Sequence, residues 1–147
     1  MKFEIRPFVG IGNAEFGMTP LEIEAVLGPS ISETITNRGE REEIREYIAV
    51  RYDNRGVVEF AFPSGADLTI DDVDLFGASG PVVVLMGYDP SPKECFGFLI
   101  FLKIGVTITG YHDGEESQRA ITTFQPGRWD SMTEHFNEFE VNPRANQ

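Results

Sequence analysis

Residues that carry catalysis or bind metals are scarce in this sequence. It contains two histidines, one cysteine and one tryptophan among 147 residues. Two histidines and one cysteine without close mutual spacing match no zinc-binding pattern. Cys95 has no partner for an internal disulfide, and its apolar neighbours predict a buried, unreactive thiol. We therefore expect a protein that uses neither a cofactor nor a metal.

Positive charge and long apolar segments are also in short supply. The 12 Lys and Arg residues face 24 Asp and Glu residues, which gives a net charge of −12. A nucleic-acid ligand is not expected, because phosphate backbones are bound by clustered basic residues. No apolar run approaches the roughly 18 residues of a membrane span, and residues 1–7 alternate like a strand rather than a signal peptide. These patterns predict a cytoplasmic protein without membrane contact.

The clearest local signal is a short helix that begins at Pro20. Thr19 is placed to cap the first turn, and Glu22, three residues later, completes a capping box. Proline is well tolerated at the first helical position. Gly28 can close the helix in a left-handed conformation, and Pro29 prevents its continuation.

Most other patterns are typical of strands. The predicted strands cover residues 3–9, 31–35, 47–52, 57–62, 67–75 and 96–102. Because residues 53–56 form a turn signal, residues 47–62 predict a β-hairpin. A second capping box at Ser131 predicts a short helix up to Phe139, and residues 142–147 are predicted to fray.

The opening motif returns in weaker form later in the chain. Phe16-Gly17 aligns with Phe76-Gly77, and Thr19-Pro20 aligns with the Ser79-Gly80-Pro81 segment. We therefore predict one α+β domain, residues 1–147, built from two degenerate repeats at about 10–75 and 76–141. Each repeat is a short helix followed by antiparallel strands. Both helices are expected on one face of a shared antiparallel sheet, with the binding surface on its other face.

Catalytic groups do not assemble into a pattern. His112-Asp113 is the most suggestive pair, but Asp-Gly at residues 113–114 is typical of a hairpin turn. His135 lies four residues beyond Ser131, near the first turn of a predicted short helix, and is predicted to be a packed or solvated histidine rather than a general base. The sequence therefore predicts a protein that is not an enzyme.

Acidic side chains form two candidate partner-binding sets. One comprises Asp71, Asp72 and Asp74, and the other comprises Asp113, Glu115 and Glu116. The first set lacks the glycine and distal glutamate of a calcium-binding loop. Both sets fit either a surface that attracts a basic protein or merely solvated sheet edges. Trp129 is predicted to pack in the core or beside a helix rather than to anchor a partner.

The first thirty residues carry a family resemblance. The segments that carry it are Gly10-Ile11-Gly12, Phe16-Gly17-Met18-Thr19, Glu22-Ile23 and Leu27-Gly28-Pro29, followed by Tyr52-Asp53 and a β-hairpin. This order resembles the opening of β-lactamase-inhibitor-like modules and of small outer-membrane assembly lipoproteins of the SmpA/OmlA type. The resemblance implies short helices followed by antiparallel strands, with two such units in tandem in the inhibitor.

The same opening in a small acidic chain is also similar to bacterial proteins regarded as immunity proteins against toxins. It implies non-enzymatic binding of another protein, most concretely an immunity-type inhibitor of a basic toxin. Twelve phenylalanines in a short chain favour a second hypothesis, a small-ligand-binding or sensing domain. The oligomeric state is left open.

Overall fold

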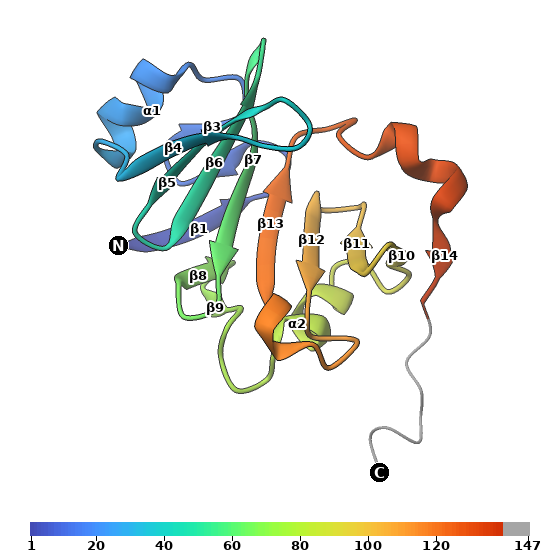
Figure 1. Ribbon diagram of the computed structural model, residues 1–147. Helices are drawn as coiled ribbons and strands as arrows, with labels where there is room; N and C mark the ends of the chain where they lie inside the picture. The colour runs from blue at the N-terminus through green and yellow to red at the C-terminus, as the bar shows by residue number, and fades with distance from the viewer. Residues whose placement is uncertain (140–147) are drawn as a thin grey trace.

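A computed structural model describes residues 1–139 of the chain, which form two β-sheets of five and nine strands (Figure 1). The predicted frayed tail, residues 142–147, lies outside the described residues. We call the sheets the small sheet and the large sheet. Of the described residues, 40% are in strands and 17% in helices, so the predicted α+β class is wrong and the fold is mostly β.

The small sheet is formed by strands from the N-terminal segment and strands from the middle of the chain. Its strands are β1 (Lys2–Arg6), β2 (Gly10–Ile11), β3 (Ala14–Glu15), β8 (Asp67–Ile70) and β9 (Val73–Asp74). Their order is β3-β2-β1-β8-β9. β1 runs parallel to β8, with Phe3 opposite Leu68, and its other neighbour, β2, is antiparallel.

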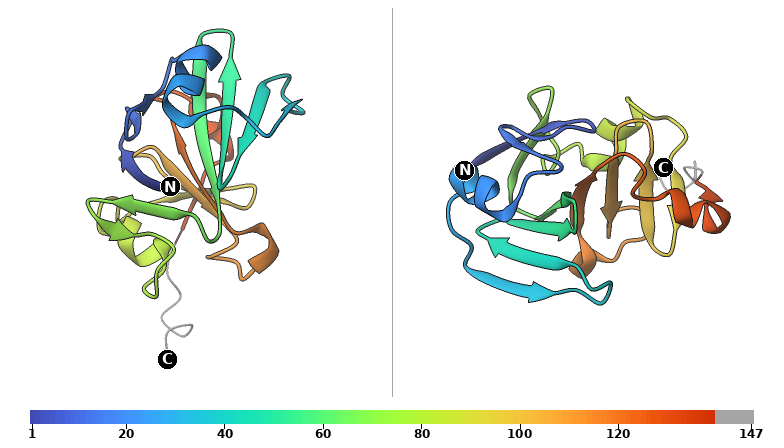
Figure 2. Two further views of the ribbon diagram at one scale, coloured as in Figure 1. Left: turned by 90° about the vertical axis from the view of Figure 1, so that its left-hand side faces the viewer. Right: turned by 90° about the horizontal axis from the view of Figure 1, so that it is seen from above.

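The large sheet is antiparallel throughout and crosses the whole molecule (Figures 1 and 2). In spatial order its strands are β14 (Asn137–Glu138), β10 (Lys93–Cys95), β11 (Phe98–Phe101), β12 (Val106–Thr109), β13 (Ala120–Phe124), β7 (Gly56–Pro63), β6 (Ile48–Asp53), β5 (Arg41–Arg45) and β4 (Ser32–Ile35). The predicted hairpin at residues 47–62 is confirmed as β6 and β7.

The main core lies between the two sheets. Alternate residues of the large sheet, such as Phe60 and Phe62, are fully buried on the face that meets the small sheet. Aromatic contacts join the two layers: the ring centroids of Phe3 and Phe62 are 5.1 Å apart, and those of Phe16 and Phe60 are 5.4 Å apart. The inward face of the large sheet is therefore used for stability.

The first helix, α1 (Pro20–Leu27), confirms the capping prediction. The Glu22 amide donates to the Thr19 hydroxyl over 3.3 Å, and the Thr19 amide donates to the Glu22 carboxylate over 3.1 Å. Gly28 ends the helix with φ 82°. Its carbonyl accepts a 2.8 Å hydrogen bond from Nε of Arg45, which ties the end of α1 to β5.

The predicted pair of repeats, residues 10–75 and 76–141, is wrong within the part of the chain that the structure describes. α1 and α2 (Pro81–Met86) are short and do not pack as two equivalent helices on a sheet. The parallel pairing of β1 with β8 joins the end of the first supposed repeat to a strand that precedes it, in a separate sheet. Such long-range pairing leaves no local pattern in a sequence. The recurring Phe-Gly and Pro signals are local patterns, and they led to the prediction of two repeats.

Three local predictions also change. Residues 67–75 form the β8–β9 hairpin rather than one strand, because Asp71 and Asp72 adopt positive φ in its turn. Ser79 does not cap α2, whose N-cap is Gly80 without a side-chain hydrogen bond. The segment after Ser131 is not a capped α-helix but the 3₁₀ helix η2 (Asp130–His135).

No helix within residues 1–139 is both long and apolar enough to span a membrane.

Gly56 makes the contact between the start of α1 and the large sheet possible. A Cβ at Gly56 (φ 118°) would lie 2.3 Å from the Gly17 carbonyl oxygen, whereas a Cβ at Gly39 (φ 78°) meets no atom within 4 Å. We predict that Gly39→Ala costs about 1–2 kcal/mol for its left-handed backbone. Gly56→Ala should cost at least about 2 kcal/mol more because of the clash, as urea unfolding would show. Equal losses of unfolding free energy in Gly39→Ala and Gly56→Ala would contradict this account.

Candidate functional site

The outward face of the large sheet carries a row of small side chains. Ala49, Ala61, Thr122 and Thr107 lie directly opposite one another across β6, β7, β13 and β12. Residues that share a row across an antiparallel sheet point to the same face. Since these side chains are short, the middle of this face is hollow.

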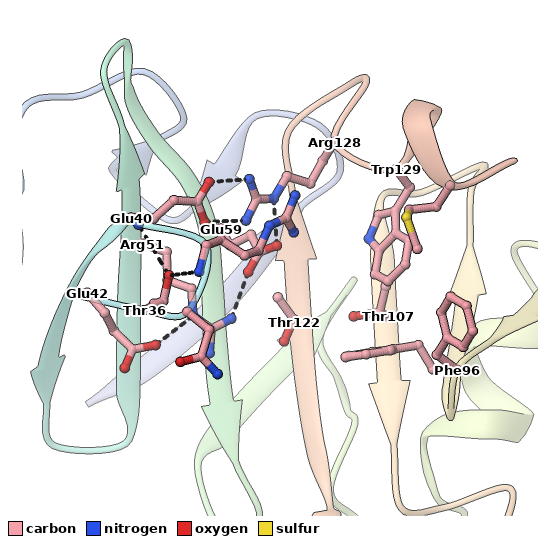
Figure 3. A pocket seen from close by; sticks show the side chains of 14 residues that line it. Thr36, Glu40, Glu42, Arg51, Glu59, Phe96, Thr107, Thr122, Arg128 and Trp129 are labelled. Atoms are coloured by element: carbon pink, nitrogen blue, oxygen red, sulfur yellow. Dashed lines mark hydrogen bonds and ion pairs between the residues drawn. The ribbon is translucent and has the colours of Figure 1, made fainter. Parts of the chain in front are cut away.

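One hollow, the Trp129 groove, is a cavity of about 590 Å³ above this row (Figure 3). Thr107 and Thr122 form its floor. One wall is aromatic and apolar, and the other is charged. The apolar wall comprises Phe96, Phe98, Trp129 and Met132, and the charged wall comprises Glu40, Glu42, Arg51, Glu59 and Arg128.

The charged wall, called here the Glu59 cluster, is held by ion pairs among its five residues. Glu59 accepts from Nη1 of Arg51 and from Nε of Arg128, both over 2.7 Å. Arg128 also forms a two-pronged pair with Glu40, with both distances 2.6 Å. Nε of Arg51 donates to Glu42 over 2.6 Å. Two-pronged guanidinium–carboxylate pairs fix geometry as well as charge.

These contacts shift the pKa values of Glu40 and Arg128. The hydrogen bond from Arg128 lowers the pKa of Glu40 and outweighs the opposing effect of burial. Burial alone would lower the pKa of Arg128, but its hydrogen bonds to Glu40 and the charge of Glu59 raise it instead. The pair of Glu40 with Arg128 therefore stays ionised near neutral pH and holds this part of the wall in one arrangement.

The apolar wall comes from the β10–β11 turn, from β11, and from η2 with the residue just before it. Trp129 meets Phe98 edge to face, with ring centroids 5.3 Å apart and planes at 61°. The Phe96 ring lies 5.2 Å from that of His135. Phe96 is 70% exposed, so a large apolar ring stands at the rim of the groove in contact with water.

The backbone of Phe96 is unusual as well. Phe96 and Gly97 connect β10 to β11 in a two-residue turn with φ 49° and 89°. Asn-Gly or Asp-Gly normally occupies such turns, because a residue with a bulky side chain is strained at positive φ. A left-handed conformation costs roughly 1–2 kcal/mol for such a residue. An exposed aromatic ring kept at this cost is an indication of function.

The six acidic residues predicted to bind a partner lie outside the Trp129 groove. Asp71 and Asp72 form the β8–β9 turn, where the Asp71 carboxylate accepts a 2.6 Å hydrogen bond from the Tyr88 hydroxyl. Asp74 caps the Phe76 amide over 3.0 Å. In the second set, Asp113 accepts from the Glu115 amide over 3.1 Å, and Glu116 begins the 3₁₀ helix η1 (Glu116–Gln118).

The two acidic sets belong to neighbouring segments. The rings of Phe76 and Tyr111, each two residues from one set, have centroids 6.4 Å apart. Three of the six carboxylates, those of Asp71, Asp74 and Asp113, accept hydrogen bonds from nearby backbone or tyrosine donors. Whether either set binds a partner therefore remains a prediction.

Sequence reasoning missed most of the groove. Trp129 was predicted to pack in the core or beside a helix, and it does pack against the buried cluster of Cys95, Ile100 and Phe124 at the start of η2. It is only partly buried, however, and its role as a groove wall was not predicted. Phe96 was placed in a buried strand, whereas it occupies an exposed turn. The signal that could have found it is Phe96-Gly97 itself, a turn-forming glycine after an aromatic residue.

Groups that serve metals or thiol chemistry are not part of this site. The prediction of a buried thiol is confirmed, because Cys95 is fully buried and burial raises its pKa. Within residues 1–139, no three His, Cys, Asp or Glu side chains are grouped so that they could hold a metal ion.

Comparison of the chain with protein-family models, with curated proteins and with solved structures found no match. The geometry of the groove and the charge of the chain are therefore the basis for inferring a function.

Arg128 should be the most sensitive charged residue of the groove. Arg128→Met leaves the largely buried Glu40 carboxylate without its guanidinium and leaves buried Glu59 with Arg51 as its remaining partner, which should cost about 3 kcal/mol at pH 7. Arg55→Met is the matched control. Its side chain is 81% exposed and pairs only with Asp53 over 3.7 Å, so the expected loss is below about 0.5 kcal/mol.

The loss of unfolding free energy in Arg128→Met should also depend on pH. Because the pKa of Glu40 is lowered in the folded protein, its stabilisation is present above its ordinary value of 4.5 and is lost at lower pH. The difference in unfolding free energy between the wild type and Arg128→Met should therefore narrow as the pH falls below 4.5. Urea unfolding across this range measures it, and a constant difference would contradict the role given to Arg128.

Proposed function

We propose that this protein is a non-enzymatic protein-binding module that acts in the cytoplasm and engages its partner through the Trp129 groove. The observation that carries the proposal is Phe96, an aromatic ring 70% exposed at the groove rim and held there in a left-handed turn. Residues in strained backbone conformations cluster at functional sites, which supports a binding role for this exposed ring.

The composition of the groove fits the centre of a protein interface. Trp, Phe, Met and Arg are the residue types enriched there, and a few buried aromatic side chains usually supply most of the binding energy. Phe96, Phe98, Trp129 and Met132 form one wall, and Arg51 and Arg128 belong to the other. Because the Glu59 cluster already fixes the charged wall, binding requires little further ordering of those side chains.

The charge of the chain supports a basic partner. A net charge of −12 speeds the encounter with a basic protein and disfavours acidic ones. The most concrete form of the proposal is an immunity-type inhibitor that covers a basic toxin. The resemblance of the segment around α1 to inhibitor modules agrees with a binding role.

Phe96→Ser tests the proposal against Val83→Ser as the control. Val83 is also an exposed apolar residue, at 69%, but it lies on α2 outside the groove. A partner captured with the tagged wild type from cells that carry this gene, then purified, should bind Val83→Ser equally well. Phe96→Ser should bind it at least about tenfold more weakly, since anchor residues contribute about 1.4 kcal/mol or more.

The measurement is the dissociation constant from isothermal titration calorimetry, with circular dichroism to verify that both variants are folded. Capture of the same partner with unchanged affinity by Phe96→Ser would refute a role for the groove. Loss of binding by Val83→Ser as well would point to another surface.

The size of the groove favours one alternative, a small-ligand-binding domain. Its volume of about 590 Å³ lies within the range of small-molecule sites. In that case flat amphipathic compounds from a metabolite library should raise the melting temperature of the wild type. Thr122→Leu, which fills the groove floor, should abolish the shift, whereas the exposed control Leu21→Ser should keep it. A library without any stabilising compound would count against this alternative.

A further inference from the structure

β4 is the longest edge strand of the two sheets, and one of its sides is free. Three of the four edge strands, β3, β9 and β14, are only two residues long. Very short edge strands discourage pairing with another chain. β4 has four residues, all exposed, without the Lys or Pro that often protects an edge. Within residues 1–139 only β5 pairs with it, so its other side lies open at the border of the large sheet (Figures 1 and 2).

The backbone of β4 presents hydrogen-bonding groups on this free side. The Thr36 amide donates to the Glu40 carbonyl over 2.8 Å, in register with the β4–β5 ladder. Hydrogen-bonded and non-hydrogen-bonded pairs alternate along an antiparallel ladder. Thr34 therefore also bonds toward β5, whereas Glu33 and Ile35 direct their N–H and C=O groups away from it. These groups are available to a further strand.

The residues from Ile31 to Ile35 have nearly the same order in both directions, Ile-Ser-Glu-Thr-Ile. A second copy laid antiparallel about Glu33 places Ile31 of each copy opposite Ile35 of the other. It also places Ser32 opposite Thr34, and such hydroxyl pairs stabilise neighbouring strands. Apolar side chains thus meet apolar ones, and hydroxyl groups meet hydroxyl groups, so this edge is complementary to itself.

Glu33 occupies the centre of this arrangement, where it would face Glu33 of the second copy. Like charges directly opposite each other on two strands are unfavourable. The Glu33 carboxylate, however, pairs with Arg41 of its own chain over 3.0 Å. Because a guanidinium accompanies each carboxylate, the repulsion between the two copies at this position is reduced.

The two isoleucines are exposed apolar side chains on the side of the sheet that carries α1. Ile31 is 75% exposed and Ile35 is 64% exposed. Ile31 borders a hollow together with Leu27, the last residue of α1, and Ile35 borders another together with Pro20, the first. A second strand at this edge would cover both isoleucines, and removal of apolar surface from water favours association.

We propose that two copies of this chain associate through β4, antiparallel about Glu33, in a two-fold symmetric dimer with one continuous large sheet. The arrangement closes on itself, because each copy uses the same edge. Residues opposite each other in antiparallel strands point to the same face, so the outward faces of both copies lie on one side. The dimer therefore presents two Trp129 grooves on the same side of the sheet. Association at β4 stands whether or not the groove binds a protein.

The charge of the chain determines how this association responds to salt. Two copies that each carry a net charge of −12 repel each other, and salt screens that repulsion. The dissociation constant of the dimer should therefore fall as the salt concentration rises. A basic partner bound at the Trp129 groove should respond in the opposite way, because salt screens its attraction.

Sedimentation velocity of the full chain, at protein concentrations up to about 1 mM, tests the proposal. The wild type should change from monomer to dimer as its concentration rises. Ile31→Lys/Ile35→Lys should dimerise at least about tenfold more weakly, since Lys on an edge strand opposes pairing. This variant carries less net negative charge than the wild type, so overall repulsion would not explain the loss. Val83→Lys, at an exposed residue of α2, is the control and should dimerise as the wild type does.

A second double variant tests the antiparallel register. Ile31→Lys/Ile35→Glu places opposite charges across the interface twice, because position 31 of each copy faces position 35 of the other. It should therefore dimerise more tightly than Ile31→Lys/Ile35→Lys. Circular dichroism verifies that all variants are folded, as expected for changes at exposed side chains.

Four outcomes would overturn the proposal. They are a wild type that stays monomeric at the highest concentration, assemblies larger than a dimer, a dimer that Ile31→Lys/Ile35→Lys leaves intact, and equal association of the two double variants. Phe96→Ser separates this proposal from the proposed function. It should dimerise normally even though it binds the partner weakly, and loss of the dimer in Phe96→Ser would place the interface at the groove instead of β4.

Discussion

The ion pairs of Arg128 determine the shape of the outward face of the large sheet. Arg128 follows β13, yet it binds Glu40 just before β5 and Glu59 within β7. The next residue is Trp129, so the same contacts set the position from which the indole reaches the groove. These buried charges depend on one another. A buried carboxylate has given up its hydration, and without the guanidinium no interaction would compensate for that loss.

The two faces of the large sheet carry side chains of different size and chemistry. The inward face is filled with aromatic and branched residues, including Phe60 and Phe62, which supply hydrophobic stabilisation. The outward face has alanine and threonine in its central row and charged residues beside it. Ion pairs add less stability than apolar packing but fix a particular geometry. The arrangement favours recognition on one face and stability on the other.

Local physical chemistry was sufficient to predict some elements. The capping box of α1 and the hairpin of β6 and β7 depend on residues close in sequence, and both predictions were right. The small sheet depends on pairing between β1 and β8, and the Glu59 cluster joins Arg128 to Glu40 across 88 positions. Neither contact leaves a pattern within one segment. The supposed repeats arose because short helix signals recur, although the chain pairs its strands differently around them.

The position of Trp129 has a practical consequence for studies of this molecule. It is the only tryptophan in the sequence, and its indole forms a wall of the groove instead of being sealed in the core. Indole emission responds to polarity and to nearby quenching groups. Tryptophan emission, excited at wavelengths that the four tyrosines do not absorb, therefore originates at the groove. It provides an optical reporter of occupancy there without any attached dye.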